Sequence, residues 1–202
     1  MNFWYQYFIF SNASIFELYF SVLIGTDDHL LYIGGWKRRG QRKKNFLSSV
    51  EFKSINNNKT CHIQSLDYAL AYHASVVTPI GVITCGGRTP DLKIRNDCFH
   101  LTNRNTWEPF PSMNEGRESF DLFVVGDILV AYDPKGNTFE RINWRNGDKW
   151  QMPVWTLNRP FYWSCVTKWD DENVLITGGR NRVSITCISL LRLLSCFIKF
   201  FL

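Results

Sequence analysis

The sequence predicts an all-β fold, and three observations support this prediction. Aromatic residues make up 16% of the 202 residues, with 8 Trp and 13 Gly, which is typical of short strands joined by tight turns. Hydrophobic residues reach 45% and charged residues 20%, a globular composition. The third observation is an internal repeat, and each copy of a repeat forms one unit of supersecondary structure.

The repeat is an apolar run that ends in a double glycine. The landmark glycines are Gly34, Gly35, Gly86, Gly87, Gly178 and Gly179. The first two pairs are 52 residues apart and the last two are 92 residues apart, twice 46, so a fourth copy is expected midway. The apolar run Ile128–Tyr132 lies there, with Ala131-Tyr132 in place of the glycines. The chain therefore holds four copies of one pattern.

A second landmark follows each of the first three runs at a similar distance. Trp107 lies 20 residues after the second glycine of its copy, and Trp150 lies 19 residues after Ala131. Cys61 takes this place in the first copy. The double glycine, the later Trp and the period near 50 resemble the kelch repeat, over residues 18–189.

This resemblance implies a β-propeller, in which each repeat is a blade of four antiparallel strands and the blades stack around a channel. The expected fold is a kelch-type β-propeller fragment of about three blades plus part of a fourth, with a ring that does not close within the chain. The expected segments are an apolar, aromatic extension at 1–17, blades at 18–70, 71–115, 116–157 and 158–189, and an apolar tail at 190–202.

Each blade has a predictable set of strands. The apolar runs are the second strands, because a strand covered on both faces is apolar throughout. The first strands are expected at Tyr19–Ile24, Ala74–Thr78, Phe120–Val125 and Tyr162–Thr167. The third strands are expected at Ser49–Lys53, Asp97–Leu101, Thr138–Ile142 and Val183–Ser189, with fourth strands around Cys61, Trp107 and Trp150.

The landmark residues have structural explanations. Glycine adopts positive φ and allows strands to approach closely, and neither a G-x-G-x-x-G nor a P-loop pattern surrounds the pairs, so no nucleotide site is expected. Each Trp is expected to fill the space between neighbouring blades. The sequence contains no nucleophile motif and no metal-ligand spacing of His or Cys, so we expect neither an enzyme nor a cofactor.

The cysteines leave the compartment open, extracellular or cytoplasmic. The order of Cys61, Cys85 and Cys98 resembles a kelch variant of secreted invertebrate proteins and implies a Cys61–Cys98 disulfide, whereas buried free thiols are the alternative. Asn12 and Asn58 lie in glycosylation sequons that only an exported chain would use, and the N-terminal sequence lacks the pattern of a signal peptide.

The net charge of +5 comes largely from one basic run, which is expected to be a solvated loop and not a nucleic-acid site. The run consists of Lys37, Arg38, Arg39, Arg42, Lys43 and Lys44. The apolar stretch 183–202 is long enough for a membrane helix, but Arg192 and Lys199 oppose this interpretation, and a truncated or mispredicted end is favoured.

The predicted function is protein binding through the loops between second and third strands, at 36–45, 88–96 and 134–137. Arg38, Arg39 and Arg42 favour an acidic partner, and a second copy of the chain would complete the ring. Two alternatives remain: the substrate-recognition part of a cullin-type ubiquitin ligase adaptor, which requires a BTB domain, and a copper-dependent carbohydrate oxidase, which copper content and peroxide production would reveal.

Overall fold

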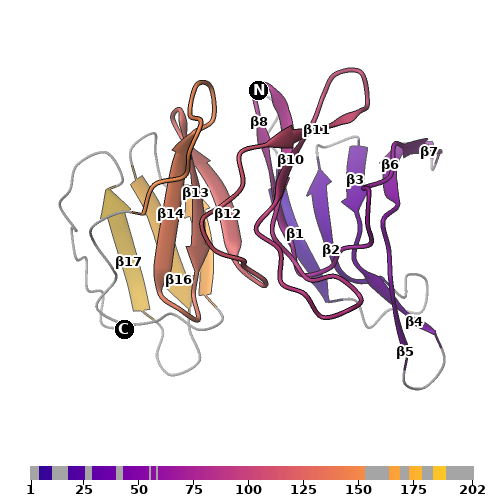
Figure 1. Ribbon diagram of the computed structural model, residues 1–202, viewed down its shortest axis with the longest axis horizontal. Helices are drawn as coiled ribbons and strands as arrows, with labels where there is room; N and C mark the ends of the chain where they lie inside the picture. The colour runs from indigo at the N-terminus through magenta and orange to yellow at the C-terminus, as the bar shows by residue number, and fades with distance from the viewer. Residues whose placement is uncertain are drawn as a thin grey trace. The chain divides into compact units, whose positions relative to one another are not determined.

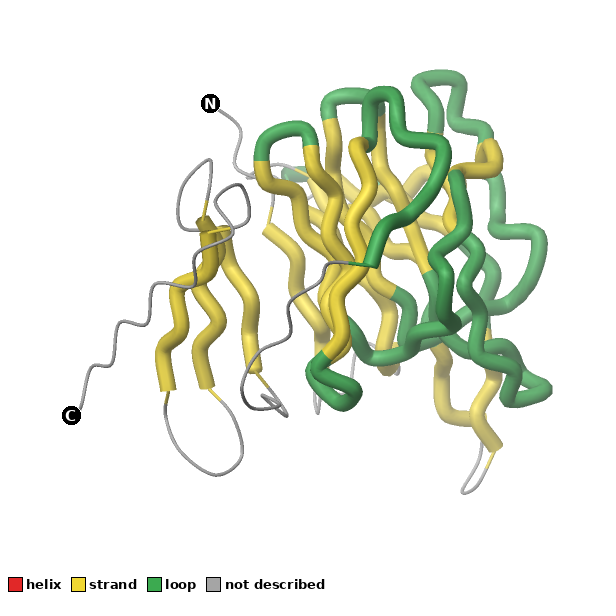
Figure 2. The backbone as a smooth tube through the Cα atoms, turned by 60° about the vertical axis from the view of Figure 1, so that its left-hand side comes forward, coloured by secondary structure: helices red, strands yellow, loops and turns green. Residues whose placement is uncertain are grey.

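A computed structural model describes residues 5–10, 18–25, 29–39, 43–54, 56–57, 59–152, 164–168, 173–178 and 184–189. These residues are all-β, in several antiparallel sheets with no helix and no closed barrel among them (Figure 2). The expected all-β class is therefore confirmed. The chain divides into two compact units, Met1–Ser119 and Phe120–Leu202.

The first sheet of unit 1 is built around four strands that follow one another in the sheet (Figure 1). These strands are β2 (Leu18–Gly25), β3 (His29–Ile33), β6 (Val50–Ser54) and β7 (Thr60–Ile63). Three more strands join β2 directly or through a neighbour: β1 (Tyr5–Phe10), β4 (Trp36–Arg39) and β5 (Lys43–Phe46). The four strands expected within residues 18–70 are present and antiparallel, and the described residues of this sheet form seven strands.

Two parts of this sheet differ from the prediction. The segment 36–45, expected as a loop, contains the antiparallel hairpin β4–β5. The N-terminal extension contains β1, which pairs with β2. The sequence does not predict the hairpin, because its strands carry basic residues in place of the apolar pattern that indicates a strand.

The second sheet of unit 1 has four antiparallel strands in chain order. They are β8 (Ala74–Thr78), β9 (Gly81–Cys85), β10 (Cys98–Leu101) and β11 (Trp107–Phe110). The strands lie within a residue or two of the predicted ranges. Strand β2 lies against β8, so the first strands of the two sheets are neighbours.

The two sheets of unit 1 repeat one backbone hydrogen-bond network. Gly35 N–H donates to the Leu70 carbonyl at 2.7 Å, and Gly87 N–H donates to the Arg117 carbonyl at the same distance. Four further N–H to carbonyl bonds have counterparts in both sheets. In the first sheet they run from Gly34 to Ser49, from Leu47 to Gly35, from Leu66 to Ser48 and from Leu70 to Leu47. In the same order, their counterparts in the second sheet run from Gly86 to Asp97, from Arg95 to Gly87, from Met113 to Asn96 and from Arg117 to Arg95. Residues 34–70 and 86–117 therefore share one framework.

The double glycines adopt matching conformations in the two copies. Gly34 and Gly35 have φ of +52° and +95°, and Gly86 and Gly87 have φ of +64° and +96°. Residues with a side chain rarely adopt such angles, which explains why the sequence repeats glycine here. The chain leaves each second strand through the same pair of left-handed residues.

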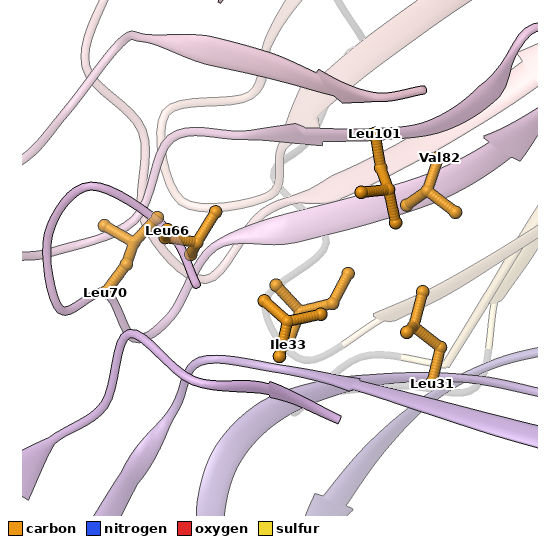
Figure 3. Packing of buried hydrophobic residues seen from close by; sticks show 7 residues of the cluster. Leu31, Ile33, Leu66, Leu70, Val82 and Leu101 are labelled. Carbon is orange, nitrogen blue, oxygen red and sulfur yellow. The ribbon is translucent and has the colours of Figure 1, made fainter. Parts of the chain in front are cut away.

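A cluster of buried aliphatic side chains from both sheets and from the segment that joins them lies in the core of unit 1, and Figure 3 shows these side chains pointing toward one another. The cluster consists of Leu31, Ile33, Val50, Leu66, Leu70, Val82 and Leu101. Trp107, which is partly buried, packs against it, and its indole N–H donates to the Gln64 carbonyl at 2.9 Å. Trp107 of the second sheet is therefore hydrogen-bonded to the segment that follows β7 of the first sheet.

The described residues of unit 2 form two three-stranded antiparallel sheets. One consists of β12 (Asp121–Val125), β13 (Ile128–Asp133) and β14 (Thr138–Asn143), and the other of β15 (Ser164–Lys168), β16 (Asn173–Gly178) and β17 (Ser184–Ser189). Strand β12 lies against β15, so the first strands of these two sheets are neighbours, as β2 and β8 are in unit 1.

Within the described residues, which end at 152 in this part of the chain, no strand forms around Trp150, where a fourth strand is expected. A single bridge joins Arg141 to Gln151, with backbone bonds of 2.9 and 2.8 Å, and Trp150 beside it is only 1% exposed. Ala131-Tyr132, which replaces the double glycine, lies inside β13, because residues with side chains continue the strand where glycines would leave it. Strand β13 therefore leads directly into the tight turn before β14.

The apolar C-terminal stretch lies partly within the described residues. Ser184–Ser189 is the strand β17, so these six residues are not part of a membrane helix. Residues 190–202 lie outside the described residues. No described segment forms a helix with the length and apolar character needed to cross a bilayer.

Candidate functional site

The segment Arg88–Asn96, here called the Leu92 loop, joins β9 to β10. It corresponds to one of the three loops that the sequence predicts as binding elements. It starts directly after Gly86-Gly87 and returns where Arg95 N–H donates to the Gly87 carbonyl at 2.8 Å. The repeated framework therefore holds both ends of this loop.

A disulfide closes the base of the Leu92 loop. Cys85, the last residue of β9, faces Cys98, the first residue of β10, and the two sulfurs are bonded. The disulfide expected between Cys61 and Cys98 is therefore wrong in its partner, and Cys61 is free and exposed. Pairing across adjacent strands brings Cys85 and Cys98 together, whereas Cys61 belongs to the neighbouring sheet.

One end of the loop is fixed by a cluster of three polar side chains. Arg95 Nε donates to Asp97 Oδ2 at 2.6 Å, and the Tyr68 hydroxyl donates to the same oxygen at 2.9 Å. The Arg95 guanidinium carbon also lies 4.8 Å from the Tyr68 ring centre. Burial, followed by the Asp97 hydrogen bond, raises the pKa of Tyr68 to about 12, so Tyr68 remains a donor at neutral pH.

The other end of the loop is fixed to two neighbouring segments. Arg88 and Ala71 exchange two backbone hydrogen bonds, of 2.7 and 3.0 Å. The Arg88 side chain forms an ion pair with Glu118, with Nη2 and Oε1 2.5 Å apart. Because the pair is partly buried, it restrains the loop more than an exposed pair would.

Inside the loop, Thr89 organises a tight turn. Its N–H donates to the Lys93 carbonyl at 3.0 Å, and Leu92 N–H donates to the Thr89 carbonyl at 2.9 Å. The Thr89 hydroxyl hydrogen-bonds to the Asp91 carboxylate, which lowers the pKa of Asp91. These bonds hold Leu92 at φ +67°, a left-handed conformation that is unfavourable for a residue with a side chain.

The loop presents two apolar side chains to solvent. Leu92 is 67% exposed and Ile94 is 43% exposed. The sequence predicts this loop as a binding element from its position and indicates neither residue. The available signal was an apolar pair, Leu92 and Ile94, between charged residues in a segment bounded by turn residues. A restrained loop with exposed aliphatic side chains can bind an apolar surface of another molecule at a small entropic cost.

The other predicted binding residues that the structure describes belong to other elements. Arg38 and Arg39 are on β4, and Lys43 and Lys44 on β5. Gly178 is the last residue of β16. The glycosylation candidates Asn12 and Asn58, together with Arg42 and Gly179, lie outside the described residues.

Within the part of the chain that the structure describes, no three His, Cys, Asp or Glu side chains are grouped as they would be to hold a metal ion. No protein-family model matches the chain. The search of curated proteins also gave no match.

Proposed function

We propose that this chain consists of kelch-type propeller blades and is a non-catalytic module that binds a protein partner through the loops between second and third strands. The observation that carries the proposal is Leu92, an exposed aliphatic side chain in a left-handed conformation. Local strain of this kind persists only where surrounding bonds impose it, and it is concentrated at functional positions.

The repeated framework supports the assignment to propeller blades. Four antiparallel strands in sequential order, a double glycine after the second strand and neighbouring first strands are the features expected of blades stacked around an axis. The match of the two hydrogen-bond networks supports a true repeat and not a chance similarity of sequence.

The contrast between the two equivalent loops supports a binding function. In the first sheet the residues between second and third strands form the basic hairpin β4–β5, and in the second they form the disulfide-closed Leu92 loop. A constant framework with different loops at equivalent positions is the usual organisation of scaffolds that recognise other proteins. The partner expected for the Leu92 loop has an apolar pocket that accepts one aliphatic side chain.

The proposal is tested with two matched variants of the full chain. Leu92→Asn removes the apolar side chain and retains a residue that accepts left-handed φ. Ile80→Asn makes the same kind of change at the turn between β8 and β9, the opposite end of β9, where Ile80 is 37% exposed.

Proteins cross-linked to the wild-type chain are identified, and the affinity of each purified candidate is then measured for all three chains. We expect a partner whose Kd rises at least about tenfold with Leu92→Asn and remains within about twofold with Ile80→Asn, as for an interface hot spot. Equal affinities for the three chains would refute binding through this loop.

A further inference from the structure

The hairpin β4–β5 concentrates basic residues that a protein-binding role for the Leu92 loop does not explain. Between Trp36 and Phe46 the sequence has six Lys or Arg and no Asp, Glu or aromatic residue. Figure 1 shows β4 and β5 extending beyond the neighbouring strands of their sheet. Lys37, at the start of the hairpin, is exposed.

The register of the hairpin places like charges opposite each other. Arg38 is opposite Lys44, and Arg39 is opposite Lys43. Like charges at opposed positions of an antiparallel pair destabilise it. The hairpin therefore carries an unfavourable concentration of positive charge that a bound polyanion would neutralise.

The disulfide of the same unit indicates what kind of polyanion the hairpin meets. Cys85 and Cys98 are buried and bonded, and disulfides form and persist in oxidising compartments such as the extracellular space. Nucleic-acid surfaces combine basic residues with exposed aromatic side chains that stack on bases. The two aromatic residues of the hairpin, Trp36 and Phe46, are opposite each other at its base, where Trp36 is buried, and residues 37–45 contain none. Both observations favour a sulfated polysaccharide over a nucleic acid.

We infer that the hairpin β4–β5, through Lys37, Arg38, Arg39, Lys43 and Lys44, is a binding site for a sulfated polysaccharide. Sulfate groups carry a negative charge at every physiological pH, and basic residues at successive positions of two paired strands suit a linear chain of such groups. This site is separate from the Leu92 loop and does not depend on the function proposed for it.

The experiment compares two quadruple variants with the same change in net charge. The hairpin variant carries Arg38→Ser, Arg39→Ser, Lys43→Ser and Lys44→Ser, and the control carries Lys59→Ser, Lys93→Ser, Arg104→Ser and Lys135→Ser, all at exposed positions. Binding of heparin, of chemically desulfated heparin and of a single-stranded RNA is measured over a range of NaCl concentrations. Because the hairpin substitutions remove repulsion, folding is expected to survive, and urea unfolding verifies it.

We expect heparin affinity to fall at least about tenfold in the hairpin variant and to change less than about threefold in the control, with a shallower salt dependence only in the hairpin variant. Desulfated heparin and RNA are expected to bind more weakly than heparin. Equal losses in both variants, no heparin binding, or RNA binding tighter than heparin would overturn the inference. Leu92→Asn is expected to leave heparin binding unchanged, so failure here and failure of the protein-binding proposal are distinguishable.

Discussion

His73 lies against Gly34, with ring Cε1 3.1 Å from the position that a Gly34 Cβ would occupy. Gly87, of the double glycine in the second repeat, also lies against His73, because a Cβ added to Gly87 would lie 2.8 Å from His73 Cβ. A fully buried histidine therefore fills the space left by two glycines that are distant in the sequence. The double glycines serve the packing of a neighbouring segment as well as the backbone turn.

Substituting these glycines is expected to destabilise the protein more than substituting a glycine in an open turn. In Gly34→Ala the new Cβ would lie 2.6 Å from the Leu70 carbonyl oxygen, and φ is +52°. In Gly87→Ala it would lie 2.8 Å from the Ala71 carbonyl oxygen, and φ is +96°. Each change should cost at least about 2 kcal/mol of unfolding free energy, from the backbone conformation and the contact together.

Gly136→Ala is the control, because its φ is not positive and its nearest contact is a carboxylate oxygen at 3.2 Å, at the end of a side chain that can move. Urea unfolding of the three variants measures the effect. A Gly87→Ala protein as stable as Gly136→Ala would contradict the tight approach of His73.

The contribution of His73 to the free energy of unfolding is expected to fall as the pH falls. Burial lowers the pKa of His73 to about 4, and a contact with the Ile33 backbone opposes this shift more weakly. The unfolded chain takes up this proton near pH 6.5, so between about pH 6.5 and pH 4 it binds more protons than the folded chain. Above about pH 7 the buried neutral His73 costs the folded protein no stability. Near pH 4 the free energy of unfolding is lower by about 3 kcal/mol because of this residue.

The measurement compares urea unfolding of wild-type protein and His73→Gln from pH 4 to pH 7.5. The stability difference between the two should shrink as pH falls, because Gln does not titrate. Asp121, whose pKa burial raises to about 7, has the opposite effect on stability, but it is present in both proteins and cancels from the difference. A difference that is constant across this range would show that His73 is not buried in its neutral form.

Non-reducing proteolysis and mass spectrometry are expected to recover a peptide that links Cys85 to Cys98. The double variant Cys85→Ser/Cys98→Ser should lose roughly 3 kcal/mol of unfolding free energy, as expected for the closure of a loop of this length. Cys61→Ser should have little effect, because Cys61 is exposed and unpaired. Recovery of a Cys61–Cys98 peptide instead would restore the pairing expected from the sequence.

Leu92→Asn is expected to leave the stability of the protein unchanged or to increase it by up to about 1 kcal/mol, because Asn accepts the left-handed conformation at lower cost. Differential scanning fluorimetry and urea unfolding provide the readout. A clear loss of stability would mean that Leu92 contributes to packing and would weaken its assignment as a binding residue.

Much of the strand pattern is readable from the sequence, since apolar runs, turn residues and the spacing of the double glycines are local signals. Strands β8 to β10 and β12 to β17 lie close to their predicted positions. The sequence does not predict the hairpin β4–β5, because its strands carry basic and not apolar residues. Around Trp150 the sequence predicts a fourth strand, whereas the described residues there form one bridge, between Arg141 and Gln151.

The candidate site depends on contacts between residues far apart in the chain. The sequence alone determined the all-β class, the repeat and the position of the Leu92 loop, because backbone preference and hydrophobic patterning act over a few residues. Only the tertiary structure decided that Cys98 pairs with Cys85, that His73 occupies the space beside Gly34 and Gly87, and that Leu92 is exposed. Strand register and packing between sheets place these groups, and neither is encoded in the local pattern.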